Sequence, residues 1–136
     1  MFIEEDPISI SIFFKKVGRH FIAYSKPDYD KMELSEEERS LYKELTLQMR
    51  PLTWGLYNEL QESAMVLDEL GNRQFNYKVY KENRLLRLIR KWNAKRDGKD
   101  VPINPTTLSK LSPDIAEVIL TEYDNVSLLD EDDEKK

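Results

Sequence analysis

The chain has 136 residues, of which 40% are apolar and 35% are charged, and its net charge is -5. These proportions fit one folded domain, because the chain is too polar for a membrane protein and too rich in large apolar side chains to be wholly disordered. The absence of cysteine excludes disulfides, thiolate zinc sites and cysteine nucleophiles, and without a signal peptide or a membrane-spanning apolar run we expect a cytoplasmic protein with no membrane partner.

The N-terminal segment alternates between apolar and other residues from Ile8 to Phe14, which is the pattern of a half-buried strand. A turn centred on Gly18 and a second apolar segment at 20–24 predict a β-hairpin. Because an isolated hairpin is marginally stable, it must pack on helices or pair with another strand. We assign residues 1–26 to this hairpin and the polar residues 27–34 to a linker.

Helical signals begin at Ser35, which forms a capping box with Glu38 and predicts a helix over 36–49. Proline at position 51 suits a first helical turn, and leucines then recur at helical spacing through residues 52–70. The two segments therefore predict two consecutive helices, or one helix with a kink.

Asn76 can cap a third helix over 77–95, whose apolar face lies opposite a stripe of lysines and arginines. After an extended VPINP segment, Ser112 and Pro113 predict the start of a last helix. We therefore expect a mainly α protein of the α+β type. It would have an N-terminal β-hairpin, a bundle of four to five helices within a domain at 35–125, and a disordered acidic tail at 126–136.

The charged residues are divided into two opposite blocks. Residues 78–99 hold nine lysines and arginines and only two acids, whereas residues 114–136 hold nine acids and only two lysines. The pattern predicts either that the two blocks shield one another or that the acidic tail competes with an acidic partner for the basic helix.

We predict no catalytic site. His20 is the only histidine and lies in a predicted strand without a neighbouring nucleophile pattern. The acidic runs at 36–38 and 130–134 lack the apolar surroundings that raise a carboxyl pKa for acid catalysis. Nucleotide-binding loops and the EF-hand spacing are absent from the sequence. We therefore expect no enzymatic activity, no cofactor and no specific metal ion.

The candidate binding residues are on the predicted helices at 52–70 and 77–95. Tryptophans and arginines that are buried in an interface often dominate its binding energy, although core packing explains a tryptophan among leucines more simply. The basic helix 78–95 could instead contact nucleic-acid phosphates, but the acidity of the chain argues against such a partner. The candidate partner-binding residues are Trp54, Tyr57, Leu60, Tyr80, Arg84, Arg87, Arg90, Lys91 and Trp92.

Three segments follow the hairpin in a characteristic order, namely RPLTWGLYNEL, RLLRLIRKWN and DGKDVPINPTTLSKLSPDIAEVILTEY. This order, with a tryptophan at a helix end, a VPI segment and a helix start at LSPDIA, resembles the small tail assembly chaperones of tailed bacteriophages over roughly residues 8–123. The resemblance implies a cytoplasmic protein, absent from or minor in the finished virion, that coats the tape measure protein while tail tube subunits are recruited.

The predicted binding surface is a groove between the helices at 52–70 and 77–95, where an amphipathic partner segment would be bound. Two other functions stay open at this point. One is a nucleic-acid-binding regulator that uses the basic helix 78–95, and the other is a structural phage head-tail or tail component. Self-association into a homo-oligomer also stays open.

Overall fold

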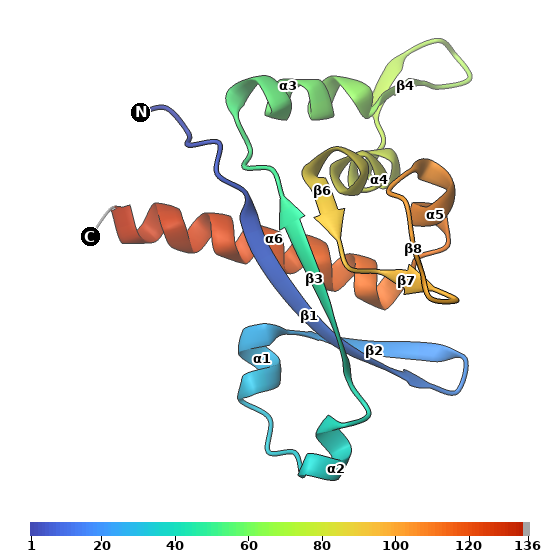
Figure 1. Cartoon of the computed structure of the whole chain (residues 1–136). Coiled ribbons are helices and arrows are strands. Elements are labelled where there is room, and N and C mark those ends of the chain that lie inside the picture. The colour runs from blue at the N-terminus through green and yellow to red at the C-terminus, as the bar shows by residue number, and fades with distance from the viewer. Residues whose placement is uncertain (135–136) are drawn as a thin grey trace.

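The computed structural model describes the backbone of residues 1–134 and the side chains of residues 1–127. Its centre is an antiparallel four-stranded sheet in the order β2-β1-β3-β6. A long helix, α6 (Pro113–Glu134), runs behind this sheet in Figure 1. The strands are β1 (Ile8–Val17), β2 (His20–Ser25), β3 (Lys43–Met49) and β6 (Ile89–Trp92).

The two faces of the sheet differ because β1 and β3 alternate in register. Ile10 pairs with Leu47, and both side chains are buried in the main core together with Ile119 of α6. The next pair along, Ser11 with Thr46, carries polar side chains on the opposite face. One side of the sheet is therefore covered and apolar, while its other side is polar at these positions and carries Phe13 further along β1.

The second half of the molecule packs at the β6 end of the sheet. Helices α3 (Trp54–Ser63) and α4 (Tyr77–Leu88) lie against one another, and the short helix α5 (Pro105–Ser109) lies beside α4 (Figure 1). Asn76 caps α4 by accepting the N–H of Val79 at 3.1 Å, as the sequence predicts. Two small hairpins complete this half, β4 (Met65–Leu67) with β5 (Arg73–Phe75), and β7 (Lys95–Arg96) with β8 (Lys99–Asp100).

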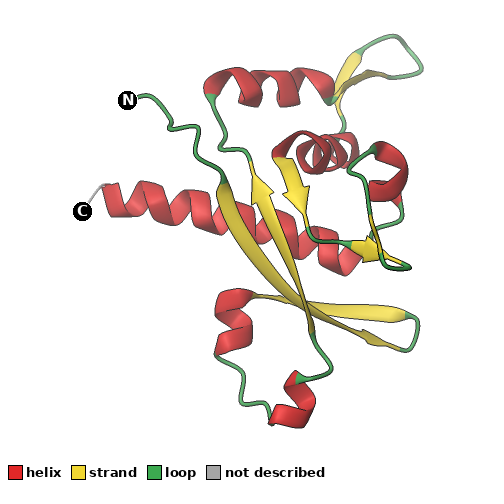
Figure 2. Ribbon diagram, in the orientation of Figure 1, coloured by secondary structure: helices red, strands yellow, loops and turns green. Residues whose placement is uncertain are grey.

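The N-terminal hairpin is confirmed, but the predicted helical bundle is wrong. Strands make up 29% of the chain and helices 40%, and only three described helices reach seven residues, so the fold is α+β around a sheet (Figure 2). The main error lies at 36–49. Ser35 does cap a helix there, but α2 (Glu36–Arg39) has only four residues and is followed by β3.

The strand β3 has a physical reason that the helical interpretation overlooked. Leu45, Leu47 and Met49 alternate with polar residues, so an extended backbone puts all three on the buried face. The hairpin β1–β2 needs a further strand, and β3 supplies it. Helical spacing of Leu41 and Leu45 coincides with this pattern over too few residues to decide between the two structures.

Other boundaries also differ from the prediction. The expected helix 52–70 stops at Ser63 before the hairpin β4–β5, and the expected helix 77–95 changes at Leu88 directly into β6. Part of the predicted linker is the helix α1 (Lys26–Asp30). The helix α6 continues to Glu134, where the sequence pattern predicts a disordered tail, and residues 135–136 lie outside the described residues. Within residues 1–134, no helix is both long enough and apolar enough to cross a membrane.

Candidate partner-binding site

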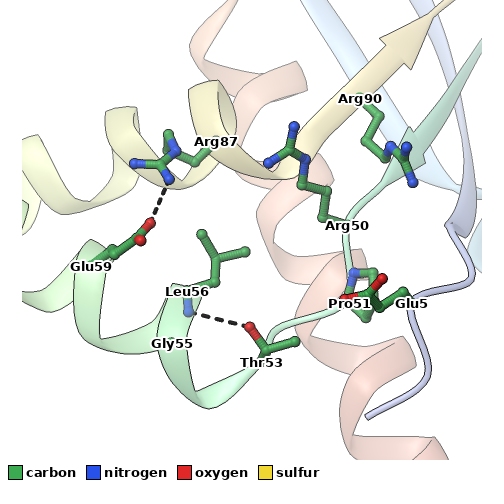
Figure 3. A pocket seen from close by; sticks show the side chains of 9 residues that line it. All are labelled: Glu5, Arg50, Pro51, Thr53, Gly55, Leu56, Glu59, Arg87 and Arg90. Atoms are coloured by element: carbon green, nitrogen blue, oxygen red, sulfur yellow. Dashed lines mark hydrogen bonds and ion pairs between the residues drawn. The ribbon is translucent and has the colours of Figure 1, made fainter.

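A pocket of about 490 Å³ opens where the end of β3, the start of α3 and the junction of α4 with β6 meet (Figure 3). Three arginines line it, Arg50 from the segment after β3, Arg87 from the last turn of α4, and Arg90 from β6. Two glutamates, Glu5 and Glu59, also contribute to the lining. The charged side chains therefore give this pocket an excess of positive charge.

The backbone of Arg50 is fixed from two sides. Its N–H donates to the carbonyl of Leu88 at 2.7 Å, and its carbonyl accepts from the Tyr123 hydroxyl at 2.9 Å. These bonds connect the end of β3 to the end of α4 and to α6. The exposed Arg50 side chain thus starts from a well-anchored main chain at the edge of the pocket.

The change from helix to strand at residue 89 positions the other two arginines. Leu88 and Ile89 are both buried, which leaves Arg87 before them and Arg90 after them on the exposed side. Arg87 Nη2 donates to Glu59 Oε2 of α3 at 2.5 Å, an exposed ion pair of small stabilising effect. Arg50 and Arg90 form no ion pair with any described side chain.

The first turn of α3 forms another wall of the pocket. Thr53 caps this helix, since its hydroxyl oxygen accepts the N–H of Leu56 at 3.2 Å. Gly55 follows in the first turn, and a Cβ atom placed there would meet no atom within 4 Å. The remaining free N–H groups at this helix end add partial positive charge to that of the arginines.

Two aromatic rings stand exposed on the same helix. Trp54 is 76% exposed and Tyr57 is 38% exposed, and their rings stack with centroids 5.8 Å apart and an interplanar angle of 18°. Leu60, one turn further, is buried in the main core. The exposed pair therefore lies outside the core, beside helix residues that line the arginine pocket.

The remaining predicted residues have structural roles or lie elsewhere. The Arg84 side chain is only 11% exposed, pairs with Asp124 at 2.5 Å and lies over the ring of Tyr80. Trp92 donates its indole N–H to the carbonyl of Val101 at 2.8 Å and packs against the core. Lys91 is exposed in β6, away from the arginine pocket. Arg87 and Arg90 therefore line one pocket, whereas Trp54 and Tyr57 are on α3 but outside the lining of that pocket.

Sequence reasoning missed Arg50, because the sequence pattern predicts a helix over 36–49 instead of the strand that ends directly before this residue. The alternation of KELTLQM is the signal that could have found it, since Arg50 directly follows that strand.

The two charge blocks pair with one another in the described residues. Lys81 forms an ion pair with Glu117 at 2.7 Å, and Arg84 pairs with Asp124, so that bases of α4 contact acids of α6. The hydrogen bond from Lys81 to Glu117 raises the pKa of this lysine. Part of the basic helix is therefore shielded within the fold, by α6 rather than by a tail.

No three histidine, aspartate or glutamate side chains among the described residues lie close enough together to hold a metal ion. Comparison of the chain with protein-family models, with curated proteins and with solved structures found no match.

Proposed function

We propose that the chain is a tail assembly chaperone of a tailed bacteriophage, which holds an amphipathic segment of the tape measure protein until tail tube subunits are recruited. The observation that carries a binding role is the exposed, stacked pair Trp54–Tyr57 on α3, the helix whose first turn also contributes to the arginine pocket. Tryptophan, tyrosine and arginine are the residues most enriched among those that dominate interface energies. The sequence resemblance over residues 8–123 supplies the identity of the partner.

The exposed rings have no role in the core that would explain them. Folding leaves most of the Trp54 ring in water, and burying such a ring against a partner removes roughly 150 to 250 Å² of surface from water, which favours association. Because the two rings already stack, little further side-chain freedom is lost when a partner covers them.

The binding surface differs from the groove that the sequence pattern predicts. The contact between α3 and α4 is closed in part by Leu60, which is buried, and the pocket beside this contact is lined by charged groups. A partner segment would therefore contact the exposed rings on one flank of α3 and the arginine pocket on another flank, instead of entering an apolar groove between two helices.

Co-expression with the tape measure protein encoded in the same genome tests the proposal. We expect the wild-type chain to keep that protein soluble and to co-purify with it, and we expect Trp54→Ala with Tyr57→Ala to lose the complex. Tyr77→Ala is the matched control, because Tyr77 is also an exposed aromatic residue but lies at the start of α4. A tape measure protein that stays insoluble, or binds wild type and the double variant equally, would contradict the proposal.

The protein composition of the finished virion distinguishes an assembly chaperone from a structural tail component. Mass spectrometry of purified virions should find the chain absent or far below the copy number of the tube subunit. A stoichiometric amount would instead show that it is part of the finished tail.

A further inference from the structure

We infer that the arginine pocket receives carboxylates of the bound partner, so that the tape measure segment recognised here is acidic beside its apolar residues. This inference rests on the proposed function, because it names the chemistry of the segment that the same surface binds. Its evidence is the pocket lined by Arg50, Arg87 and Arg90.

The charges in the pocket are only partly balanced. Glu59 pairs with Arg87, whereas Arg50 and Arg90 have no ion-pair partner among the described side chains. A guanidinium group presents parallel N–H donors that match the two oxygens of a carboxylate. Arg50 and Arg90, which line the same pocket, therefore offer complementary positions for acidic side chains of a partner.

The size and placement of the pocket suit inserted side chains. Its volume of about 490 Å³ lies within the range of sites that enclose a small ligand. Trp54 and Tyr57 stand on the helix whose first turn lines it. A segment that contacts two flanks of α3 can thus cover the rings with its apolar residues while its acids reach the arginines.

The neighbouring acids favour a peptide over a nucleic acid. Glu5 and Glu59 belong to the same lining and would repel a continuous phosphate chain, while discrete carboxylates can avoid them. Elsewhere on α4, Lys81 and Arg84 are already paired with acids of α6. Ion pairs at Lys81, Arg84 and Arg87 therefore interrupt the stripe of positive charge along α4 that could follow a nucleic-acid backbone.

An array of overlapping peptides from the tape measure protein tests the inference, with the intact chain as the probe and with titration of the whole tape measure protein in parallel. We compare wild type with Arg50→Gln plus Arg90→Gln and with the corresponding glutamate variants. Lys16→Glu plus Arg19→Glu is the matched control, because both residues are exposed in the first hairpin and far from the lining residues. Circular dichroism checks that each variant folds.

We expect the bound peptides to be rich in aspartate and glutamate, and we expect the glutamate variants to lose affinity about tenfold or more, with a smaller loss for the glutamine variants and none for the control. Replacing the acids of a bound peptide by their amides should have the same effect as the glutamine variants.

Binding that is indifferent to Arg50 and Arg90, by peptides and by the whole protein, would overturn the inference and leave the proposed function intact. Failure of the wild-type chain to bind the whole tape measure protein would instead reject the proposed function. Labelled single-stranded or duplex DNA is the third probe. If DNA binds in a salt-dependent manner that the glutamate variants abolish while acidic peptides do not bind, the pocket is a nucleic-acid site and the inference is wrong.

Discussion

Replacing Tyr123 by phenylalanine should lower the stability of the protein at neutral pH and raise it in strong alkali. The side chain of Tyr123 is 1% exposed, and its hydroxyl donates to the Arg50 carbonyl at 2.9 Å. Loss of a neutral hydrogen bond of this kind costs about 1 kcal/mol of unfolding free energy, since the ring itself keeps its packing. At pH 7 the variant should therefore be less stable than wild type by about that amount.

The effect of pH follows from the same burial. Burial raises the pKa of Tyr123 from its ordinary value of 10.0 to about 12, although the nearby Arg84 guanidinium opposes the shift. The folded state thus holds the phenolic proton at pH values where the unfolded state has lost it. The stability that this proton contributes is complete below pH 10 and is lost as the pH rises through 12, on the order of 2 kcal/mol in total. Phenylalanine has no such proton to lose, so the two stability curves should cross within this interval.

Urea denaturation, followed by tryptophan fluorescence at a series of pH values from 7 to 12, measures both effects. Tyr77→Phe is the control. Because Tyr77 is largely exposed, this substitution should change the free energy of unfolding neither at neutral pH nor above pH 10. If wild type and Tyr123→Phe lose stability in parallel above pH 10, the buried phenol is not the group that titrates and the reasoning fails.

Three further changes test other parts of the fold. Leu47→Ala should destabilise the protein by about 2 to 5 kcal/mol in chemical denaturation, because Leu47 is buried in β3, whereas Leu41→Ala at an exposed position should change little. A small effect at Leu47 would speak against the strand. Gly55→Ala should raise the melting temperature, with a gain of about 0.5 to 1 kcal/mol, since a Cβ there meets open space inside a helix; a loss would show an undetected clash. A double-mutant cycle of Arg84→Met and Asp124→Asn should give a favourable coupling of about 0.5 to 3 kcal/mol, because Arg84 is largely buried. Additive effects would mean that the pair does not interact in solution.

Local signals in the sequence identified the elements whose stability is mainly local. The hairpin was found from its alternation and the turn at Gly18, and the starts of α4 and α6 were found from Asn76 and Pro113. In each case the residues that determine where the element begins or turns lie within a few positions of one another in the sequence. The cap at Ser35 was also correct, but a cap only starts a helix and does not determine its length.

The elements that were missed depend on partners distant in the chain. Strand β3 is specified by its pairing with β1, and β6 by its pairing with β3, neither of which local spacing reveals. For residues 89–92 the helical pattern of the preceding turns continues, and the pairing of Ile89, Lys91 and Trp92 with β3 favours an extended backbone. The candidate site shares this origin, since Arg50, Arg87 and Arg90 meet only once these two strands have formed. Exposure of Trp54 was likewise not predictable, because a tryptophan among leucines fits a core equally well.

The position of α6 in the chain has a consequence for folding during translation. Strands β1 to β6 are all synthesised before residues such as Ile119 and Tyr123, and these residues cover the apolar side of the sheet. Until α6 emerges, a nascent chain therefore exposes Ile12 and Leu47 to water and to other nascent chains. Completion of the domain awaits its last helix, and released chains that are truncated before residue 113 should remain sensitive to protease although they contain β1 to β8.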